Sequence, residues 1–106
     1  MVRRGEIWLV SLDPTIGSEI QKTRPCMVVS PAEIHDHLRT VIVAPMTTGS
    51  RSAGFRVPIS FDGKDGLVLL EQCRALDKRR LVKRLGTVPA PVLDQVLTTL
   101  RDMFGP

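Results

Sequence analysis

The stretch DPTIGSEIQKTRPCMVVS, residues 13–30, decides the fold of this chain. Its first half is polar, rich in turn-forming residues and without periodicity, whereas its second half is an apolar run suited to a buried strand. Arg24 and Pro25 join the two halves. Pro25 favours an extended backbone at Arg24 and can open a strand, although it cannot donate a hydrogen bond to a ladder. The pattern predicts a loop that brings Arg24 to the root of a strand over residues 26–30, where a rigid sheet can hold a functional side chain.

The rest of the chain is expected to form more short strands and one long helix. Apolar runs bounded by turn-forming residues predict strands over residues 6–12, 40–46, 55–59, 67–76 and 84–88, with a turn over residues 62–66. Pro45 should mark the place where the third strand leaves its ladder. After Pro91, apolar residues recur at steps of three and four, at Val92, Leu93, Val96, Leu97, Leu100 and Phe104, which predicts a C-terminal helix that packs on the sheet.

Residues 31–38 are expected to form a short helical turn capped by Ser30. Its two histidines, His35 and His37, are alternate residues that a helix points apart, and no third ligand is close to them in the sequence. A solvated turn is therefore favoured over a metal site.

Strands as short as these bury both faces and protect their edges only when the sheet curls on itself. A chain of 106 residues has room for one such core. We therefore expect a mainly β (α+β) fold with one domain over residues 1–106, built as a small closed or half-closed barrel with a C-terminal α-helix.

Net charge and aromatic content indicate what kind of partner the chain could bind. The formal net charge is +4 and the sequence pI is near 9.7, which favours a polyanion. Only 4% of the residues are aromatic, so affinity for RNA would come from charge and loop hydrogen bonds rather than from base stacking. Because no apolar run is long enough to span a bilayer and no signal peptide is recognisable, a cytoplasmic protein without membrane contact is expected.

The chain lacks a P-loop, a GxSxG or GxGxxG motif and a metal-ligand cluster, so neither cofactor nor metal is expected. Cys26 and Cys73 lie far apart, which predicts buried or half-buried thiols. Polar candidates remain at strand–loop junctions: Arg24, Thr47 and Glu19. Guanidinium, hydroxyl and carboxylate groups can cleave RNA by positioning its own 2′-hydroxyl. From these residues alone, a structural ion pair for Arg24 and a loop cap for Thr47 stay the favoured interpretations.

The order of short motifs resembles the MazF/PemK family of toxins from type II toxin–antitoxin systems. RGEIW at residues 4–8, DPT at 13–15, GSE at 17–19 and TRP at 23–25 resemble its N-terminal signature. APMTT at 44–48, AGF at 53–55, DG at 62–63 and LEQCRALD at 70–77 resemble the later motifs. The resemblance covers nearly the whole chain.

The resemblance implies an SH3-like barrel of the MazF/CcdB/Kid type, usually a homodimer. It further implies a ribosome-independent, metal-independent endoribonuclease that cuts single-stranded RNA, chiefly messenger RNA, at short sequences. The expected products carry a 2′,3′-cyclic phosphate and a 5′-hydroxyl end. A cognate MazE-like antitoxin is expected to block the RNA groove.

The resemblance also assigns roles to residues of this chain. Arg24 and Thr47 match the catalytic arginine and threonine, and Glu19 matches a loop glutamate that supports activity. The residues predicted to bind RNA are Ser18, Gln21, Lys22, Thr48, Arg51, Glu71 and Gln72. Leu69 and Ser18 stand where the PemK/Kid branch has an arginine and a histidine, so the MazF-type pair Arg24/Thr47 is the expected machinery.

Two other classes of function stay open. One is a non-catalytic toxin of the same fold that binds a protein such as DNA gyrase, as CcdB-like relatives do, although a gyrase binder has no need of a phosphate clamp. The other is a plain SH3-like binding module without toxicity.

Overall fold

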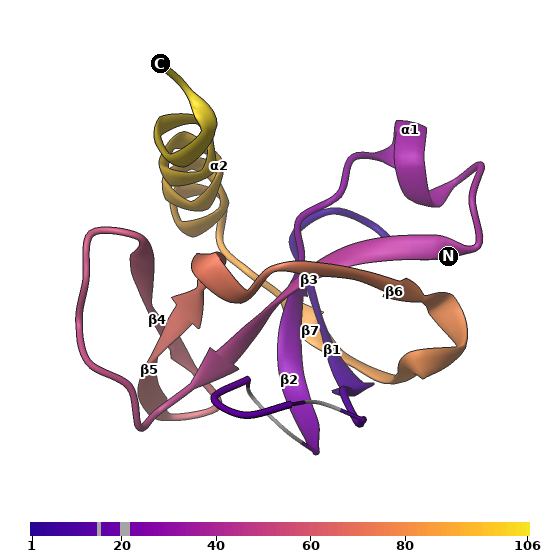
Figure 1. Ribbon diagram of the computed structural model, residues 1–106, viewed down its shortest axis with the longest axis horizontal. Coiled ribbons are helices and arrows are strands. Elements are labelled where there is room, and N and C mark those ends of the chain that lie inside the picture. Colours follow the sequence, from indigo (N-terminus) through magenta and orange to yellow (C-terminus); the bar gives the residue numbers. More distant parts are fainter. Residues whose placement is uncertain (15, 20–21) are drawn as a thin grey trace.

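The computed structural model describes residues 1–14, 16–19 and 22–106 (Figure 1). Within them the chain forms the strands β1 (Glu6–Ser11), β2 (Thr23–Val28), β3 (Thr40–Thr47), β4 (Arg56–Phe61), β5 (Lys64–Leu69), β6 (Arg74–Asp77) and β7 (Leu81–Thr87). The helices are α1 (Ala32–His35) and α2 (Ala90–Phe104), with single 3-10 turns at η1 (Leu70–Gln72) and η2 (Lys78–Arg80). None of the described helices is long and apolar enough to cross a membrane.

The strands form a curled antiparallel sheet in the order β4-β5-β3-β2-β1-β7, and β6 pairs with β3 as well. Strand β3 is the pivot. It pairs with β2 as far as Pro45, whereas its last two residues, Met46 and Thr47, pair with β5. Pro45 therefore marks the place where β3 leaves the β2 ladder, as predicted, and the sheet turns into a half-barrel there. Figure 1 shows the β4–β5 hairpin and α1 at opposite ends of this sheet, with α2 beside the hairpin.

Both faces of the central strands are buried. Met27 belongs to an apolar cluster that includes Val96 of α2, whereas its neighbours Cys26 and Val28 belong to a second cluster with Val10. Successive residues of a strand point to opposite faces, so a strand covered on both sides needs apolar residues at every position. This explains why residues 26–29 are apolar without interruption.

Several strand boundaries differ from the prediction; β7 begins at Leu81 rather than at residue 84, because the chain rejoins β1 directly after η2, and β4 runs on to Phe61 rather than ending at residue 59. Strand β2 begins at Thr23 rather than at residue 26, so Arg24 lies inside the strand, paired in register with Val10 of β1. The predicted strand over residues 67–76 is broken by η1, because β5 and β6 pair with different parts of β3. The register between them shifts by three residues, and the 3-10 turn takes up these extra residues.

The turn predicted over residues 62–66 is shorter. Asp62 and Gly63, with φ of 53° and 74°, form a two-residue hairpin turn, and β5 already begins at Lys64. Two positive φ angles match the twist of the flanking strands, and an Asp-Gly pair adopts them readily. Asp65 and Gly66 consequently lie in the ladder, where Gly66 pairs with Ile59.

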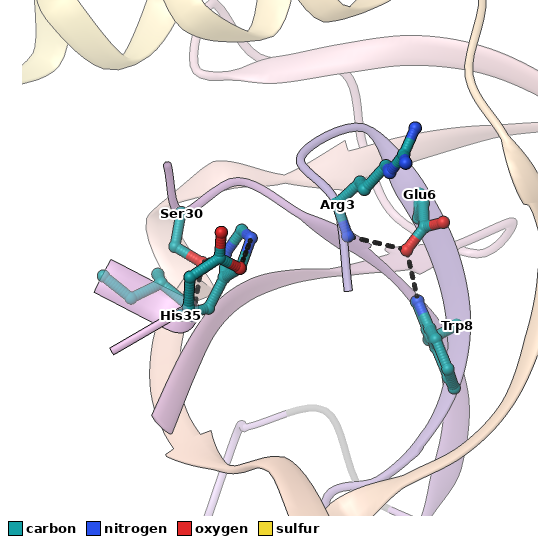
Figure 2. A network of polar contacts seen from close by, with 7 residues as sticks. Arg3, Glu6, Trp8, Ser30 and His35 are labelled. Carbon is teal, nitrogen blue, oxygen red and sulfur yellow. Dashed lines mark hydrogen bonds and ion pairs between the residues drawn. The ribbon is translucent and has the colours of Figure 1, made fainter. Parts of the chain in front are cut away.

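The two histidines have different surroundings. His37 is exposed, as predicted, but His35 is 2% exposed, so the expectation of a solvated side chain was wrong for it. Ser30 does not cap α1. Its Oγ lies 2.9 Å from His35 Nδ1 (Figure 2) and accepts a hydrogen bond from the Ile42 backbone N at 3.1 Å. The polar pair ties α1 to β3, which explains the burial of His35.

Helix α2 confirms the predicted C-terminal helix packed on its own sheet. Its apolar side chains join the cluster around β4 and β5, with Val96 fully buried. Met103 packs there in the last turn, while Phe104 is 77% exposed, contrary to the predicted apolar stripe. Gly105 follows as the C-terminal cap.

Glu6 is a carboxylate buried at the start of β1. Its Oε1 accepts hydrogen bonds from the Arg3 backbone N at 2.8 Å and from Trp8 Nε1 at 3.1 Å (Figure 2), and its Oε2 lies 3.4 Å from Arg84 Nη1 of β7. Burial alone would raise the pKa of Glu6, but the hydrogen bonds and the Arg84 charge together lower that pKa below its ordinary value. Glu6 therefore ties the chain before β1 to the β1–β7 edge.

Glu6→Gln is expected to lower the free energy of unfolding at neutral pH by about 1–3 kcal/mol, the range for hydrogen bonds to a charged group. A lowered folded-state pKa means that this stabilisation is complete above the ordinary value of 4.5 and disappears as the pH falls through the folded-state value. Urea unfolding should therefore show a gap between the variant and the wild type that narrows in acid. Glu33→Gln, which changes an exposed carboxylate of α1, is the control; a gap that stays constant in acid contradicts the assignment.

Candidate active site

The site begins where the β2–β3 ladder ends. Cys26 and Pro45 are its last pair, and Pro25 stands next to it on β2. Neither proline can donate a backbone hydrogen bond, so the strands part at this point. Beyond the Cys26–Pro45 pair, β2 stays with β1 while β3 turns to β5, so Arg24 and Thr47, each two residues past that pair, lie where the strands diverge.

Arg24 and Thr47 line one groove of about 270 Å³. Its walls come from β2, β3, β4, β5 and β7: Arg24, Pro25, Met46, Thr47, Thr48, Ile59, Phe61, Asp62, Lys64, Gly66 and Leu85. Arg24 and Thr47 are half-buried, so solvent reaches both. With two cationic residues, Arg24 and Lys64, against Asp62, the lining favours an anion.

Backbone contacts hold Thr47 from two sides. Its Oγ1 accepts a hydrogen bond from Gly49 N at 3.3 Å, which leaves the hydroxyl proton available for a ligand. On β5, a Cβ built on Gly66 would lie 2.6 Å from the Thr47 carbonyl O. Glycine is therefore what allows β5 to approach the end of β3 this closely.

A second hollow, of about 380 Å³, adjoins the same bend of β3. Its lining residues are Leu12, Glu19, Pro45, Glu71, Gln72, Cys73 and Arg74. Pro45 lines this hollow, whereas its neighbour Met46 lines the groove with Arg24. Glu19 lines the second hollow rather than the groove. Its Oε1 accepts a hydrogen bond from Ile16 N at 2.6 Å.

The structure divides the predicted site residues into three sets. Arg24, Thr47 and Thr48 line the groove, and Glu19, Glu71 and Gln72 line the second hollow. Ser18, Lys22 and Arg51 are exposed and line neither. Gln21 lies outside the described residues.

Arg56 is a residue of this region that the sequence reasoning missed. It begins β4, pairs in register with Leu69, and forms an ion pair with Glu71. The pair depends on the β4–β5 register and on η1, neither of which was predicted. The departure from the PemK/Kid pattern at Leu69 was the available signal, since Leu69 is the cross-strand neighbour of Arg56.

The two thiols do not supply a nucleophile at neutral pH. Cys26 is buried, and burial raises its pKa to about 12 despite the opposing charge of Arg74. Cys73 is half-buried, and burial raises its pKa as well. Both are free cysteines, in agreement with the predicted thiols, and both stay protonated. In the described part of the chain, no three His, Cys, Asp or Glu residues gather into a possible metal site.

Solved structures place this curled sheet in the class of MazF toxins. MazF from Deinococcus radiodurans (Form-I) superimposes with a TM-score of 0.86 and 30% sequence identity, over 99% of this chain and 97% of that one. A MazE–MazF structure from the same organism (Form-II) gives a TM-score of 0.79 and 27% identity, over 98% and 95% of the two chains.

Sequence comparison leads to the same class. Endoribonuclease PemK from Escherichia coli is 45% identical over 109 residues, which cover 97% of this chain and 82% of that protein. The model of the PemK-like, MazF-like toxins of type II toxin–antitoxin systems matches residues 3–104. The chain belongs to this family, which confirms the resemblance seen in its motifs.

Proposed function

We propose that this chain is a toxin that cuts single-stranded RNA, chiefly messenger RNA, in the cytoplasm. The observation that carries the proposal is the convergence of Arg24 and Thr47 on a cationic groove at the split between β2 and β3. The name of the Escherichia coli relative, an endoribonuclease, supports it.

The reaction uses a nucleophile that RNA itself carries. The 2′-oxygen attacks the adjacent phosphorus while the bond from phosphorus to the 5′-oxygen breaks, which leaves a 2′,3′-cyclic phosphate and a 5′-hydroxyl end. The 2′-hydroxyl gives up one proton, and the departing 5′-oxygen takes up one. Because nucleophile and leaving group both belong to the RNA, the protein has to align them and stabilise charge at phosphorus, which requires no metal.

Each residue then has a role. The planar fork of Arg24 binds two phosphoryl oxygens and stabilises their negative charge. Because a guanidinium is a poor proton acceptor, charge stabilisation rather than proton transfer is its main contribution. Thr47 donates its hydroxyl hydrogen to a phosphoryl oxygen. Glu19, at the rim of the adjoining hollow, accepts a proton or orients Arg24.

RNA is proposed to run over both hollows, since Pro45 and Met46 connect them. Thr48 contacts it in the groove, and Glu71 and Gln72 contact bases in the second hollow. Ser18, Lys22 and Arg51, which are exposed, complete the proposed contacts. Gln21, which lies outside the described residues, is proposed as a contact from the family resemblance alone.

The proposed partner that silences this toxin is a MazE-like antitoxin laid over the groove. The MazE–MazF structure among the solved relatives supports this partner. The toxin is proposed to act as a homodimer, with residues 1–106 as one toxin domain.

Cleavage of a long defined RNA by the pure protein tests the function. We expect discrete cuts at a short recurring sequence, with 2′,3′-cyclic phosphate and 5′-hydroxyl ends, at the same rate with and without EDTA. A strict metal requirement or 5′-phosphate ends would refute the chemistry. Intact RNA under conditions in which the protein binds DNA gyrase would favour the non-catalytic class instead.

A further inference from the structure

Arg56 joins two segments that border the proposed RNA path. Its Nε and Nη2 donate to Glu71 Oε2, at 3.0 and 2.5 Å, and its Nη1 donates to the Arg51 carbonyl O at 2.9 Å. One guanidinium therefore connects the loop between β3 and β4 with η1, 15 residues away from Arg56 in the sequence.

The side chains of this contact are partly shielded from solvent. The side chain of Arg56 is 21% exposed and that of Glu71 is 27% exposed. The Arg56 guanidinium also lies over the Phe55 ring, 5.7 Å from its centroid. The hydrogen bonds that Arg56 donates to Glu71 raise the pKa of the Arg56 guanidinium above its ordinary value. Three hydrogen bonds from one guanidinium to two segments fix the geometry more firmly than a single surface ion pair would.

Glu71 is the end of this connection that meets the RNA path. Both hydrogen bonds from Arg56 go to Oε2, and no hydrogen bond to Oε1 is formed by the described residues. Glu71 lines the second hollow, whereas Arg56 lines neither the hollow nor the groove. Arg56 thus fixes one carboxylate oxygen while the other stays available to a hydrogen-bond donor such as a base amino group.

We propose that Arg56 is a positioning residue of the RNA site, which holds the Glu71 carboxylate and the loop at Arg51 in the arrangement that binds RNA. The inference rests on the proposed nuclease function. Its effect on RNA passes through Glu71 and the loop, because Arg56 itself does not line either hollow.

Kinetics of Arg56→Ala, Glu71→Ala and the double variant test this role on a short RNA that contains one cut site. Arg56→Ala is expected to raise KM about tenfold, the cost of losing one recognition contact to a base, with kcat within about threefold of wild type. The double variant should be no worse than either single variant by more than about twofold, because both changes remove the same contact. Arg56→Lys keeps the charge but loses the fork, so it should rescue only part of the affinity.

Arg79→Ala is the matched control, since it removes one positive charge and one ion pair, with Asp77, at an exposed site. It should leave KM within about twofold of wild type, because an exposed pair contributes little. Hydrogen exchange adds a readout that needs no activity. Arg56→Ala should speed amide exchange in residues 49–54 and 70–73, and Arg79→Ala should not.

Different failures have different signatures. If wild-type protein and Arg24→Ala both leave RNA intact, the nuclease function fails, while the exchange data still decide whether Arg56 orders the two segments. If exchange is unchanged in Arg56→Ala, or if the effects of Arg56→Ala and Glu71→Ala multiply, the positioning role is overturned. An unchanged KM in Arg56→Ala overturns it as well.

Discussion

Arg24→Ala is expected to slow RNA cleavage on the order of a hundredfold to a thousandfold, the loss seen when one donor to a developing negative charge is removed. The reason is geometric, since Arg24 lines the same groove as Thr47 at the split between β2 and β3 and supplies a forked positive group there. Arg24→Lys keeps the charge but cannot bind two oxygens in one plane, so it should recover only a small part of the rate. The rate of product formation at saturating RNA measures the loss.

Thr47→Ala offers a second measure of the same arrangement and should have an effect in the same range, with Thr47→Ser restoring most of the rate. Arg101→Ala is the control for loss of positive charge, because Arg101 is exposed in the last turn of α2. Thermal unfolding shows whether each variant is folded. Folded Arg24→Ala protein that cuts RNA at the wild-type rate would exclude this groove as the active site.

Gly66→Ala is expected to have the second largest effect, although Gly66 contributes no side chain. The new Cβ would lie 2.6 Å from the Thr47 carbonyl O, so β5 and the end of β3 must move apart. Overpacking of this kind costs about 1–3 kcal/mol of stability. Cleavage should fall about a hundredfold, because a displacement of about 1 Å at a catalytic group has that consequence.

The comparison for Gly66→Ala is Gly54→Ala, where a new Cβ meets no atom within 4 Å. Its free energy of unfolding should stay within about 0.5 kcal/mol of wild type, as for other surface changes. Urea unfolding and single-turnover cleavage, measured on both variants, separate stability from chemistry. Gly66→Ala protein with wild-type stability and rate would show that the close approach of β5 is unimportant.

Local patterns in the sequence predicted most of the fold. The apolar run after Pro25 indicated a strand buried on both faces, and Pro45 indicated the point at which β3 leaves its ladder. The motifs also singled out Arg24 and Thr47, which the fold brings to one groove. The strand features depend on neighbouring residues, which is why they could be recognised without coordinates, whereas Arg24 and Thr47 were singled out through the resemblance to the MazF/PemK family.

Features that depend on register could not be predicted in the same way. The break at η1 arises because β5 and β6 pair with different parts of β3. No residue near the break indicates that the register against β3 shifts by three residues there. The contact between Arg56 and Glu71 follows from that break. His35 illustrates the same limit, since its burial depends on a hydrogen bond with Ser30 and on β3 rather than on the polar residues around it.

Pro45, in the last pair of β2 and β3, and Pro25, next to that pair, lie where the two strands separate. A proline nitrogen carries no hydrogen in any state of the protein, so a small local rearrangement cannot extend the β2–β3 ladder to close this open seam between the two strands. We therefore expect no dormant form produced by the chain alone. An inhibitor is therefore expected to act by occupying the open seam rather than by closing it.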